Sequence, residues 1–158
     1  MIDTYQARLA TPFGVLGIST DEQFVTGIRF LPRATPTLPP RRNSLAHLAC
    51  VQLNAYLDRA DFAFELPIKL RGSAHQIKVW EALKAISPGS ALTYGQLAAR
   101  VGSAPLAIGQ ACGGNPLPVV IPCHRVVGAR GLGGFMGGKH QDCLAIKRWL
   151  LEHEGYAA

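Results

Sequence analysis

Several features that would each fix a class of protein are missing from this sequence. It contains no run of about 18 apolar residues, so we expect no membrane-spanning helix and no membrane partner. The opening residues MIDTYQARLA lack a basic stretch followed by an apolar one, which favours a cytoplasmic location. The glycine-dense loop GARGLGGFMGGK lacks the GxxxxGK motif followed by Ser or Thr, which argues against a phosphate-binding P-loop.

The cysteines also lack the spacing of a metal or disulfide framework. Cys50, Cys112, Cys123 and Cys143 form no CxxC pair. In a reducing compartment, four scattered cysteines are better interpreted as free thiols than as disulfides or zinc ligands. We therefore predict no metal and no cofactor, and one reactive cysteine remains a candidate.

The charge of the chain is unevenly distributed. Among 158 residues, 48% are hydrophobic and 16% are charged, which is typical of a globular protein with one domain or two small ones. Residues 1–68 carry six basic and six acidic side chains, whereas residues 69–158 carry ten and four, so the net charge of +6 lies in the second part. This asymmetry indicates either a polyanionic partner, nucleic acid first, or a surplus that aids solubility.

Residues 1–68 are predicted to form a scaffold domain of sheet and helix. Alternation predicts antiparallel strands over 4–10, 14–20 and 24–31, then a proline-rich connector, and a further strand over 62–70. Ser44 is the expected N-cap of a helix whose apolar face is formed by Leu48, Val51, Ala55 and Tyr56. This part offers no group of reactive side chains.

Residues 69–158 are predicted to form a mostly helical domain, which makes the fold class α+β. Ser73 caps a helix that stops before Pro88, and a last helix carries a stripe of Leu144, Ile146, Lys147, Leu150 and Leu151. Trp80 and Trp149 are expected in the core. Two short helices, over 93–101 and 105–115, surround a glycine-containing break and match a helix-turn-helix pattern.

The second of these short helices has no charge and very small side chains. It lacks the Arg and Asn side chains that read the major groove, which favours sequence-independent docking in the minor groove. Burial of the same small residues against a neighbouring helix explains the composition equally well.

Cys123 and His124, within Ile121–Val126, are the best candidates for chemistry. A thiol becomes a strong nucleophile when it loses its proton, and a neighbouring imidazole can accept that proton. Adjacent side chains on a strand point to opposite faces, so contact between these two requires a turn or a bridging water. A buried cysteine beside a capping histidine is the structural alternative.

The motifs of Gly72–Gly155 allow a family to be named. VWEAL, TYGQLA, NPLPVVIPCHRVVG, GGFMGG and KRWLLEHEG occur in that order. The stretch resembles the O6-alkylguanine-DNA alkyltransferases, also called methylated-DNA–protein-cysteine methyltransferases. The resemblance implies a ribonuclease-H-like first domain over 1–68, and a DNA-binding and alkyl-transfer domain with a helix-turn-helix over 69–158.

The resemblance also implies a mechanism and a set of site residues. Cys123 would take the alkyl group irreversibly, His124 would activate it through a water, and Glu154 would orient His124. The substrate would be O6-alkylguanine, with O4-alkylthymine as a second candidate, flipped out of double-stranded DNA by a monomer bound in the minor groove. The implied substrate-binding residues are Tyr94, Asn115, Arg125, Val126, Phe135 and Met136. The implied DNA-binding residues are Tyr94, Leu106, Ala107, Gln110 and Gly113.

Three departures from the family pattern bear on affinity and lesion range. Leu106 stands where the family has an arginine, Phe135 replaces a tyrosine, and KHQDC after Gly138 is a short insertion. A leucine can still wedge between base steps. Two other functions stay open: a lesion-binding module that recruits repair factors without transfer, and a cysteine hydrolase.

Overall fold

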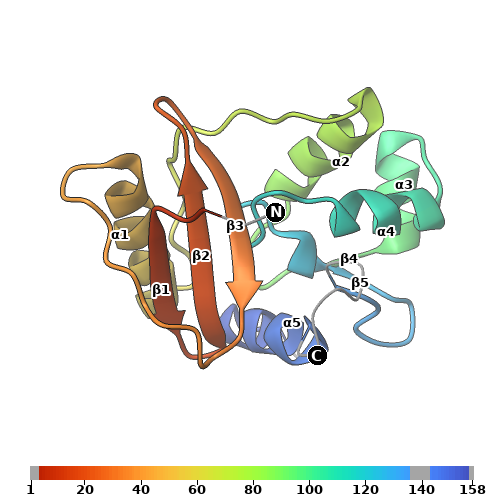
Figure 1. The fold of residues 1–158 in the computed structure, drawn as a ribbon. Coiled ribbons are helices and arrows are strands. Elements are labelled where there is room, and N and C mark those ends of the chain that lie inside the picture. Colours follow the sequence, from red (N-terminus) through yellow and green to blue (C-terminus); the bar gives the residue numbers. More distant parts are fainter. Residues whose placement is uncertain (1–3, 136–142, 157–158) are drawn as a thin grey trace. The chain divides into compact units, whose positions relative to one another are not determined.

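The computed structural model describes residues 4–135 and 143–156, and it divides into two compact units, Met1–Lys69 and Leu70–Ala158 (Figure 1). The fold is α+β, as predicted: the first unit contains a small antiparallel sheet and one helix, and the second is mainly helical. No helix in the part of the chain that the structure describes is long and apolar enough to cross a membrane.

The sheet of the first unit has the order β1-β2-β3, with β1 (Ala7–Thr11), β2 (Gly14–Thr20) and β3 (Val25–Leu31) all antiparallel. The turn between β1 and β2 is closed by the Thr11 hydroxyl, which donates to Gly14 O at 2.7 Å and accepts from Phe13 N at 3.2 Å. Gly14 has φ 129°, a conformation that side-chain-bearing residues rarely adopt. The three predicted strands are therefore confirmed within a few residues.

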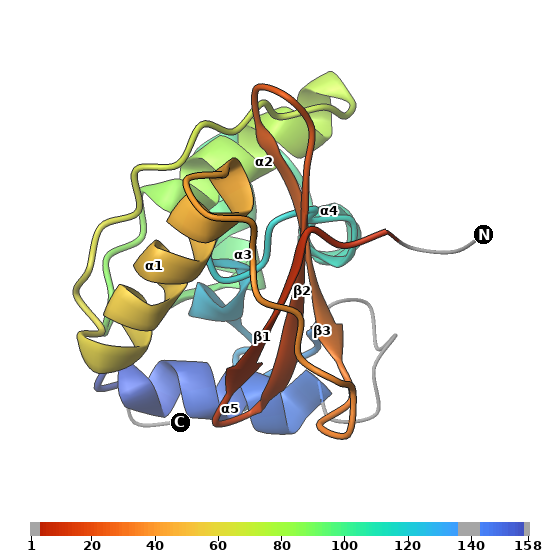
Figure 2. The ribbon, with the colours of Figure 1, turned by 60° about the vertical axis from the view of Figure 1, so that its left-hand side comes forward.

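Helix α1 (Leu45–Asp58) packs against one face of this sheet (Figure 2). Ser44 caps it as predicted, accepting from His47 N at 3.1 Å. The predicted buried face is wrong in part, because Leu48 and Val51 are 40% and 52% exposed. The buried side chains of α1 are Ala46, Ala49, Cys50, Gln52, Leu53 and Tyr56.

The strand predicted over 62–70 is not formed. Only one isolated bridge, Val25 with Ile68, joins this segment to the sheet, and Val25 N donates to Pro67 O at 2.8 Å. The Gln52 side chain takes the place of a neighbouring strand: it donates to Glu65 O at 3.0 Å and accepts from Glu65 N at 2.8 Å. A side-chain amide thus provides the hydrogen bonds of backbone groups that were predicted to pair within a sheet.

The second unit contains four helices among its described residues: α2 (Ala74–Lys84), α3 (Tyr94–Val101), α4 (Pro105–Gly113) and α5 (Cys143–His153). Ser73 and Thr93 each begin a capping box with the glutamine three residues later, so α2 and α3 start where the sequence predicts. β4 (Leu92–Thr93) and β5 (Val126–Val127) pair in parallel beside the short 3-10 turn η1 (Cys123–Arg125).

Helices α3 and α4 are joined by a tight break, as expected (Figure 1). Gly102 ends α3 in the left-handed region at φ 68°, and Ser103 Oγ lies 2.7 Å from His75 Nε2 of α2. The indole of Trp80 donates to Ala111 O at 2.9 Å, which fixes α4 on α2. Trp80 is buried as predicted.

Two expectations for α5 are wrong. Leu144 is 51% exposed, and Trp149 is only half-buried, with its ring stacked on His153 at 4.7 Å. Trp149 covers the outer side of the helix instead of filling the core. The rest of the predicted stripe is buried, together with Cys143. The insertion KHQDC lies outside the described residues except for Cys143, where α5 begins.

Candidate active site

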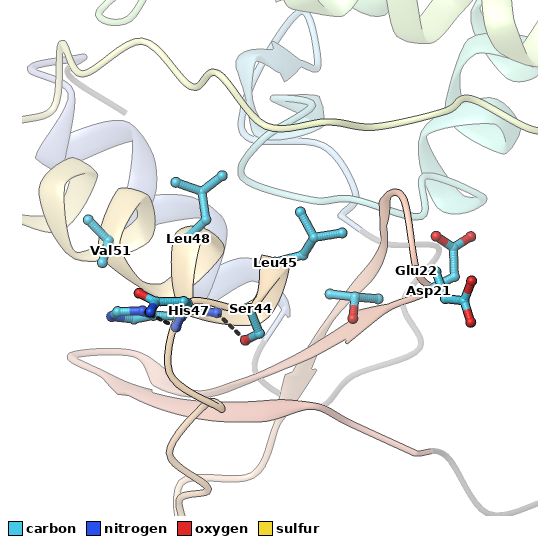
Figure 3. A pocket seen from close by; sticks show the side chains of 9 residues that line it. Asp21, Glu22, Ser44, Leu45, His47, Leu48 and Val51 are labelled. Carbon is cyan, nitrogen blue, oxygen red and sulfur yellow. Dashed lines mark hydrogen bonds between the residues drawn. The ribbon is translucent and has the colours of Figure 1, made fainter.

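The hollow of the first unit does not assemble a reactive set. It lies between the turn that carries Asp21 and Glu22 and the start of α1 (Figure 3). Asp21 Oδ1 accepts from the amides of Gln23 and Phe24, and Ser44 and His47 accept backbone amides at the start of the helix. These polar groups hold turns and the start of the helix in place.

Cys123 and His124 lie on the 3-10 turn η1, which supplies the turn that the sequence requires for contact between adjacent side chains. The turn is closed by Arg125 N donating to Pro122 O at 3.0 Å. Four residues before Cys123, Val119 has φ 76°. A β-branched residue in this region stores about 1–3 kcal/mol of strain, which is typical of functional segments. The segment that leads to Cys123 therefore has a strained backbone conformation at Val119.

The imidazole of His124 is fully buried, and its two nitrogens have different surroundings. Its Nε2 lies 2.8 Å from Glu154 Oε2, just after the end of α5. Its Nδ1 has no hydrogen-bond partner among the described residues. Burial lowers the pKa of His124, and the nearby carboxylate raises it by a smaller effect. A neutral ring with Nε2–H donated to the carboxylate leaves a lone pair on Nδ1.

Arg125 points at the same carboxylate. Its Nε donates to Glu154 Oε1 at 2.9 Å and its Nη2 donates to Glu154 Oε2 at 3.0 Å, while Nη1 donates to the carbonyl of Ile86. Both partners are buried. Arg125 and His124 therefore share one carboxylate.

Cys123 is buried and holds its proton tightly. Desolvation raises the pKa of this thiol to about 11, although the Asn115 side chain and the Lys147 charge act in the opposite direction. Asn115 follows the end of α4; its amide donates to Ile121 O at 2.8 Å and accepts from Leu117 N at 2.9 Å. Cys123 is therefore a thiol at neutral pH, and it needs a base to become a nucleophile.

Lys147 was not among the predicted site residues, and its only signal in the sequence is a lysine within the buried stripe of α5. It is 0% exposed, and its ammonium donates to the carbonyls of Val126 and Gly134. Burial lowers the pKa of Lys147 to about 8, partly offset by Cys123 and Cys112. The Tyr94 hydroxyl donates to the same Gly134 carbonyl at 3.1 Å. Among the described residues no carboxylate pairs with this buried lysine, an arrangement that is rare and typical of a functional site.

The remaining predicted substrate residues lie around this lysine or outside the described part. Val126 and Phe135 are buried, and Met136 lies outside the described residues. Gly133 lets the chain pass close to Tyr94, because an added Cβ would lie 2.7 Å from the tyrosine ring. Tyr94, Val126, Gly134 and Lys147 are therefore joined by one set of contacts.

Four of the five predicted DNA-binding residues lie on α4, and the fifth, Tyr94, begins α3. Leu106 is 76% exposed, Gln110 is exposed, and Ala107 and Gly113 are half-buried. The opposite side of the helix buries Ile108, Ala111 and Cys112. Burial of small residues against neighbouring structure is therefore confirmed for Ala111, whereas docking in the minor groove stays a prediction. Among residues 4–135 and 143–156, no cluster of three His, Cys, Asp or Glu could hold a metal ion.

The site combines a buried thiol with a neighbouring imidazole whose Nε2 is bound to a carboxylate. This arrangement is typical of proteins that use a cysteine as nucleophile. The family model for the DNA-binding domain of 6-O-methylguanine DNA methyltransferase matches residues 74–156. A methylated-DNA–protein-cysteine methyltransferase of Salmonella typhimurium is 36% identical, covering 99% of this chain and 98% of that protein. The chain belongs to the methylated-DNA–protein-cysteine methyltransferase family.

Solved structures agree with this assignment. The crystal structure of an O6-methylguanine methyltransferase of Mycobacterium tuberculosis has a TM-score of 0.78 at 32% identity, covering 96% of this chain and 93% of that one. A crystal structure of the Mycobacterium tuberculosis protein in complex with DNA has a TM-score of 0.77 at 32% identity, covering 94% and 91%. The similarity therefore extends over both units.

Proposed function

We propose that this protein repairs DNA by moving the alkyl group of O6-alkylguanine onto Sγ of Cys123, once per molecule. Methyl transfer from methylated DNA to a protein cysteine is the activity for which its relatives over nearly the full chain are named. The observation that carries the assignment to this site is the buried His124 ring, whose Nε2 is bound to Glu154 and whose Nδ1 has no hydrogen-bond partner among the described residues.

The transfer is a direct displacement at the alkyl carbon. His124 Nδ1 accepts the proton of the Cys123 thiol, directly or through a water, and Glu154 stabilises the resulting imidazolium. The S–C bond forms while the C–O6 bond breaks, and the electron pair of that bond leaves with guanine. The imidazolium then returns its proton to guanine. A thiol and O6-alkylguanine become a thioether and guanine, so the protein is used up.

The reacting base must leave the duplex, because a buried thiol cannot reach O6 within the stack. We assign the receiving pocket to Tyr94, Asn115, Val126, Phe135 and, outside the described residues, Met136. The contacts that join Tyr94, Lys147 and the backbone at Val126 and Gly134 support this assignment. O4-alkylthymine is the second candidate lesion for the same pocket.

Helices α3 and α4 are proposed to act as a helix-turn-helix docked in the minor groove. The open side of α4 offers Leu106, Ala107, Gln110 and Gly113, and none of these carries a charge. Small uncharged side chains permit close approach to sugars, and Leu106 has the exposure needed for a wedge. The surplus of positive charge in residues 69–158 supplies contacts to phosphates.

Residues 1–68 are proposed to act as a ribonuclease-H-like scaffold, and the protein to act as a cytoplasmic monomer. The three-stranded antiparallel sheet covered by α1 supports the scaffold role, and the polar groups of its hollow are used in turns and caps. Residues 69–158 hold both the DNA-binding helices and the thiol.

The experiment that tests the function counts turnovers. The protein is mixed with an oligonucleotide duplex containing O6-methylguanine, and the remaining lesion is measured by chromatography of the digested DNA. We expect one lesion removed per protein molecule and none after that. A lesion-binding module would bind the duplex and remove nothing, and a hydrolase would continue beyond one equivalent. The names of the curated relatives favour transfer over lesion binding alone.

A further inference from the structure

Each of the three guanidinium nitrogens of Arg125 donates a hydrogen bond inside the protein. Two of its nitrogens bind the two oxygens of Glu154, and the third binds the Ile86 carbonyl between α2 and β4. Glu154 Oε2 accepts from Arg125 Nη2 and also lies 2.8 Å from His124 Nε2. The guanidinium, the carboxylate and the imidazole thus form one buried hydrogen-bonded group.

The charges of this group balance when His124 carries one proton. Glu154 contributes one negative charge and Arg125 contributes one positive charge, so a neutral imidazole leaves the group without net charge. An ionised carboxylate can only accept hydrogen bonds, so the single ring proton must lie on Nε2. The lone pair is then on Nδ1, the nitrogen that has no partner among the described residues.

We propose that Arg125 is a positioning residue that keeps His124 in the Nε2–H form by balancing the charge of Glu154. The proposal rests on the proposed function, in which His124 Nδ1 takes the proton of Cys123. It replaces the substrate-binding role that the resemblance implied for Arg125. Arg125 acts only through Glu154 and touches no reacting atom.

Removing Arg125 would leave one unbalanced negative charge in a buried site, and the site would take up a proton to neutralise it. If the proton binds His124, both ring nitrogens are protonated. If it binds Glu154, the carboxylic acid donates to Nε2, and the neutral ring must carry its own proton on Nδ1. Both routes place a hydrogen on Nδ1 and remove the base. Raising the pH removes the extra proton, and the lone pair on Nδ1 can then act as a base again.

Other ionisable groups near His124 do not replace Arg125. Lys147 of α5 also disfavours protonated His124, but its ammonium is bound to the carbonyls of Val126 and Gly134 and not to Glu154. Within the part of the chain that the structure describes, the other ionisable groups that act in this site are the thiols of Cys123 and Cys112 and the Tyr94 phenol. Helix α2, which also packs on the η1 turn, buries only Val79, Trp80 and Leu83.

The first measurement locates the ring proton without using the reaction. Nitrogen-15 NMR of histidine-labelled protein distinguishes a protonated from an unprotonated Nδ1, and a His124→Gln spectrum assigns the signal. At pH 7 we expect an unprotonated Nδ1 in the wild type and in an Arg148→Met control, which removes an exposed arginine of α5. We expect a protonated Nδ1 in Arg125→Met. An unprotonated Nδ1 in Arg125→Met would overturn the proposal.

The second measurement is the pH profile of the single-turnover transfer rate. Loss of a general base lowers a rate by about 100-fold or more, so Arg125→Met should be slower by that factor at pH 7 and recover as the pH rises. Arg125→Met with Glu154→Gln removes both charges, and we expect it to transfer faster at pH 7 than Arg125→Met alone. A loss that is equal at every pH, or a double variant no faster than the single one, would contradict the proposal.

A third variant keeps the test decisive if Arg125→Met does not fold. Arg125→Lys keeps the charge and loses the fork, so we expect its Nδ1 to stay unprotonated at pH 7. A protonated Nδ1 in folded Arg125→Lys would refute charge balance. If the wild type transfers no methyl group, the proposed function fails, whereas the NMR comparison still decides the role of Arg125.

Discussion

Nε2 of His124 lies 2.8 Å from Oε2 of Glu154, although the two residues are 30 positions apart in the sequence. This contact joins the η1 turn to the residue just after α5, and both side chains are fully buried. The end of the last helix therefore sets the orientation of the proposed base. The contact also makes Glu154 the common partner of His124 and Arg125.

Glu154→Ala should damage both activity and stability. Without the carboxylate, His124 loses its orientation, and we expect the transfer rate to fall by about 100-fold or more. Arg125 is left buried without its partner, which costs about 3–5 kcal/mol of the free energy of unfolding. Single-turnover kinetics and urea unfolding measure the two effects. The control is Glu152→Ala, at an exposed position of α5. Equal behaviour of the two variants would contradict the assignment.

The Cys123 thiol should stay protonated in the resting protein. Burial raises its pKa to about 11, so thiolate absorbance near 240 nm should appear only at strongly alkaline pH. The difference between wild type and Cys123→Ser isolates this thiol from Cys50 and Cys112, which burial also keeps protonated. A thiolate signal from Cys123 below pH 8 would mean that the resting site already holds the nucleophile without a base.

Lys147 should make stability depend on pH. Burial lowers its pKa to about 8 in the folded protein, from the ordinary value of 10.5 that applies to the unfolded chain. Between these values the unfolded chain binds more protons, so stability rises with pH across the window. Relative to Lys147→Met, the wild type should gain about 3 kcal/mol from pH 8 to pH 10.5.

The measurement for Lys147 is urea unfolding at several pH values, compared as a difference between the two proteins. The difference cancels much of the effect of buried thiols, whose raised pKa values lower the stability of both proteins at alkaline pH. Lys78→Met, at an exposed position of α2, is the control and should show no such rise. A constant difference for Lys147→Met across this range would show that the ammonium is not desolvated.

Leu106→Ala should weaken DNA binding and leave the fold intact. The side chain is 76% exposed in the free protein, so its loss removes little folding energy. Three carbons withdrawn from a base step correspond to about 2 kcal/mol, or roughly 30-fold in Kd. Fluorescence anisotropy with a lesion-containing duplex measures the change. Leu144→Ala, a leucine of α5 that is 51% exposed, is the control, and unchanged affinity for Leu106→Ala would exclude the wedge.

Features encoded by neighbouring residues could be predicted from the sequence. Ser73 and Thr93 start their helices with glutamine three residues later, and Gly102 ends α3, because caps depend on a few adjacent side chains. The strands β1 to β3 follow from local pattern in the same way.

Several features that depend on distant partners could not be predicted from the local pattern of residues. The segment over 62–70 alternates like a strand, but the Gln52 amide from α1 binds its backbone instead. Periodicity identified α1 and misplaced its face, because Leu48 and Val51 are as apolar as the residues that are buried. The partner of Arg125 is 29 residues away, and nothing beside Arg125 in the sequence indicates it.

The most direct test of the central claim follows the methyl group itself. The protein is incubated with a duplex that contains O6-methylguanine whose methyl group is trideuterated. The protein is then digested and analysed by peptide mass spectrometry. The account predicts the labelled methyl group on the peptide containing Cys123 and on no other cysteine, with Cys123→Ser unlabelled and its DNA lesion intact. Label on Cys112 or another residue, or removal of the lesion by Cys123→Ser, would contradict it.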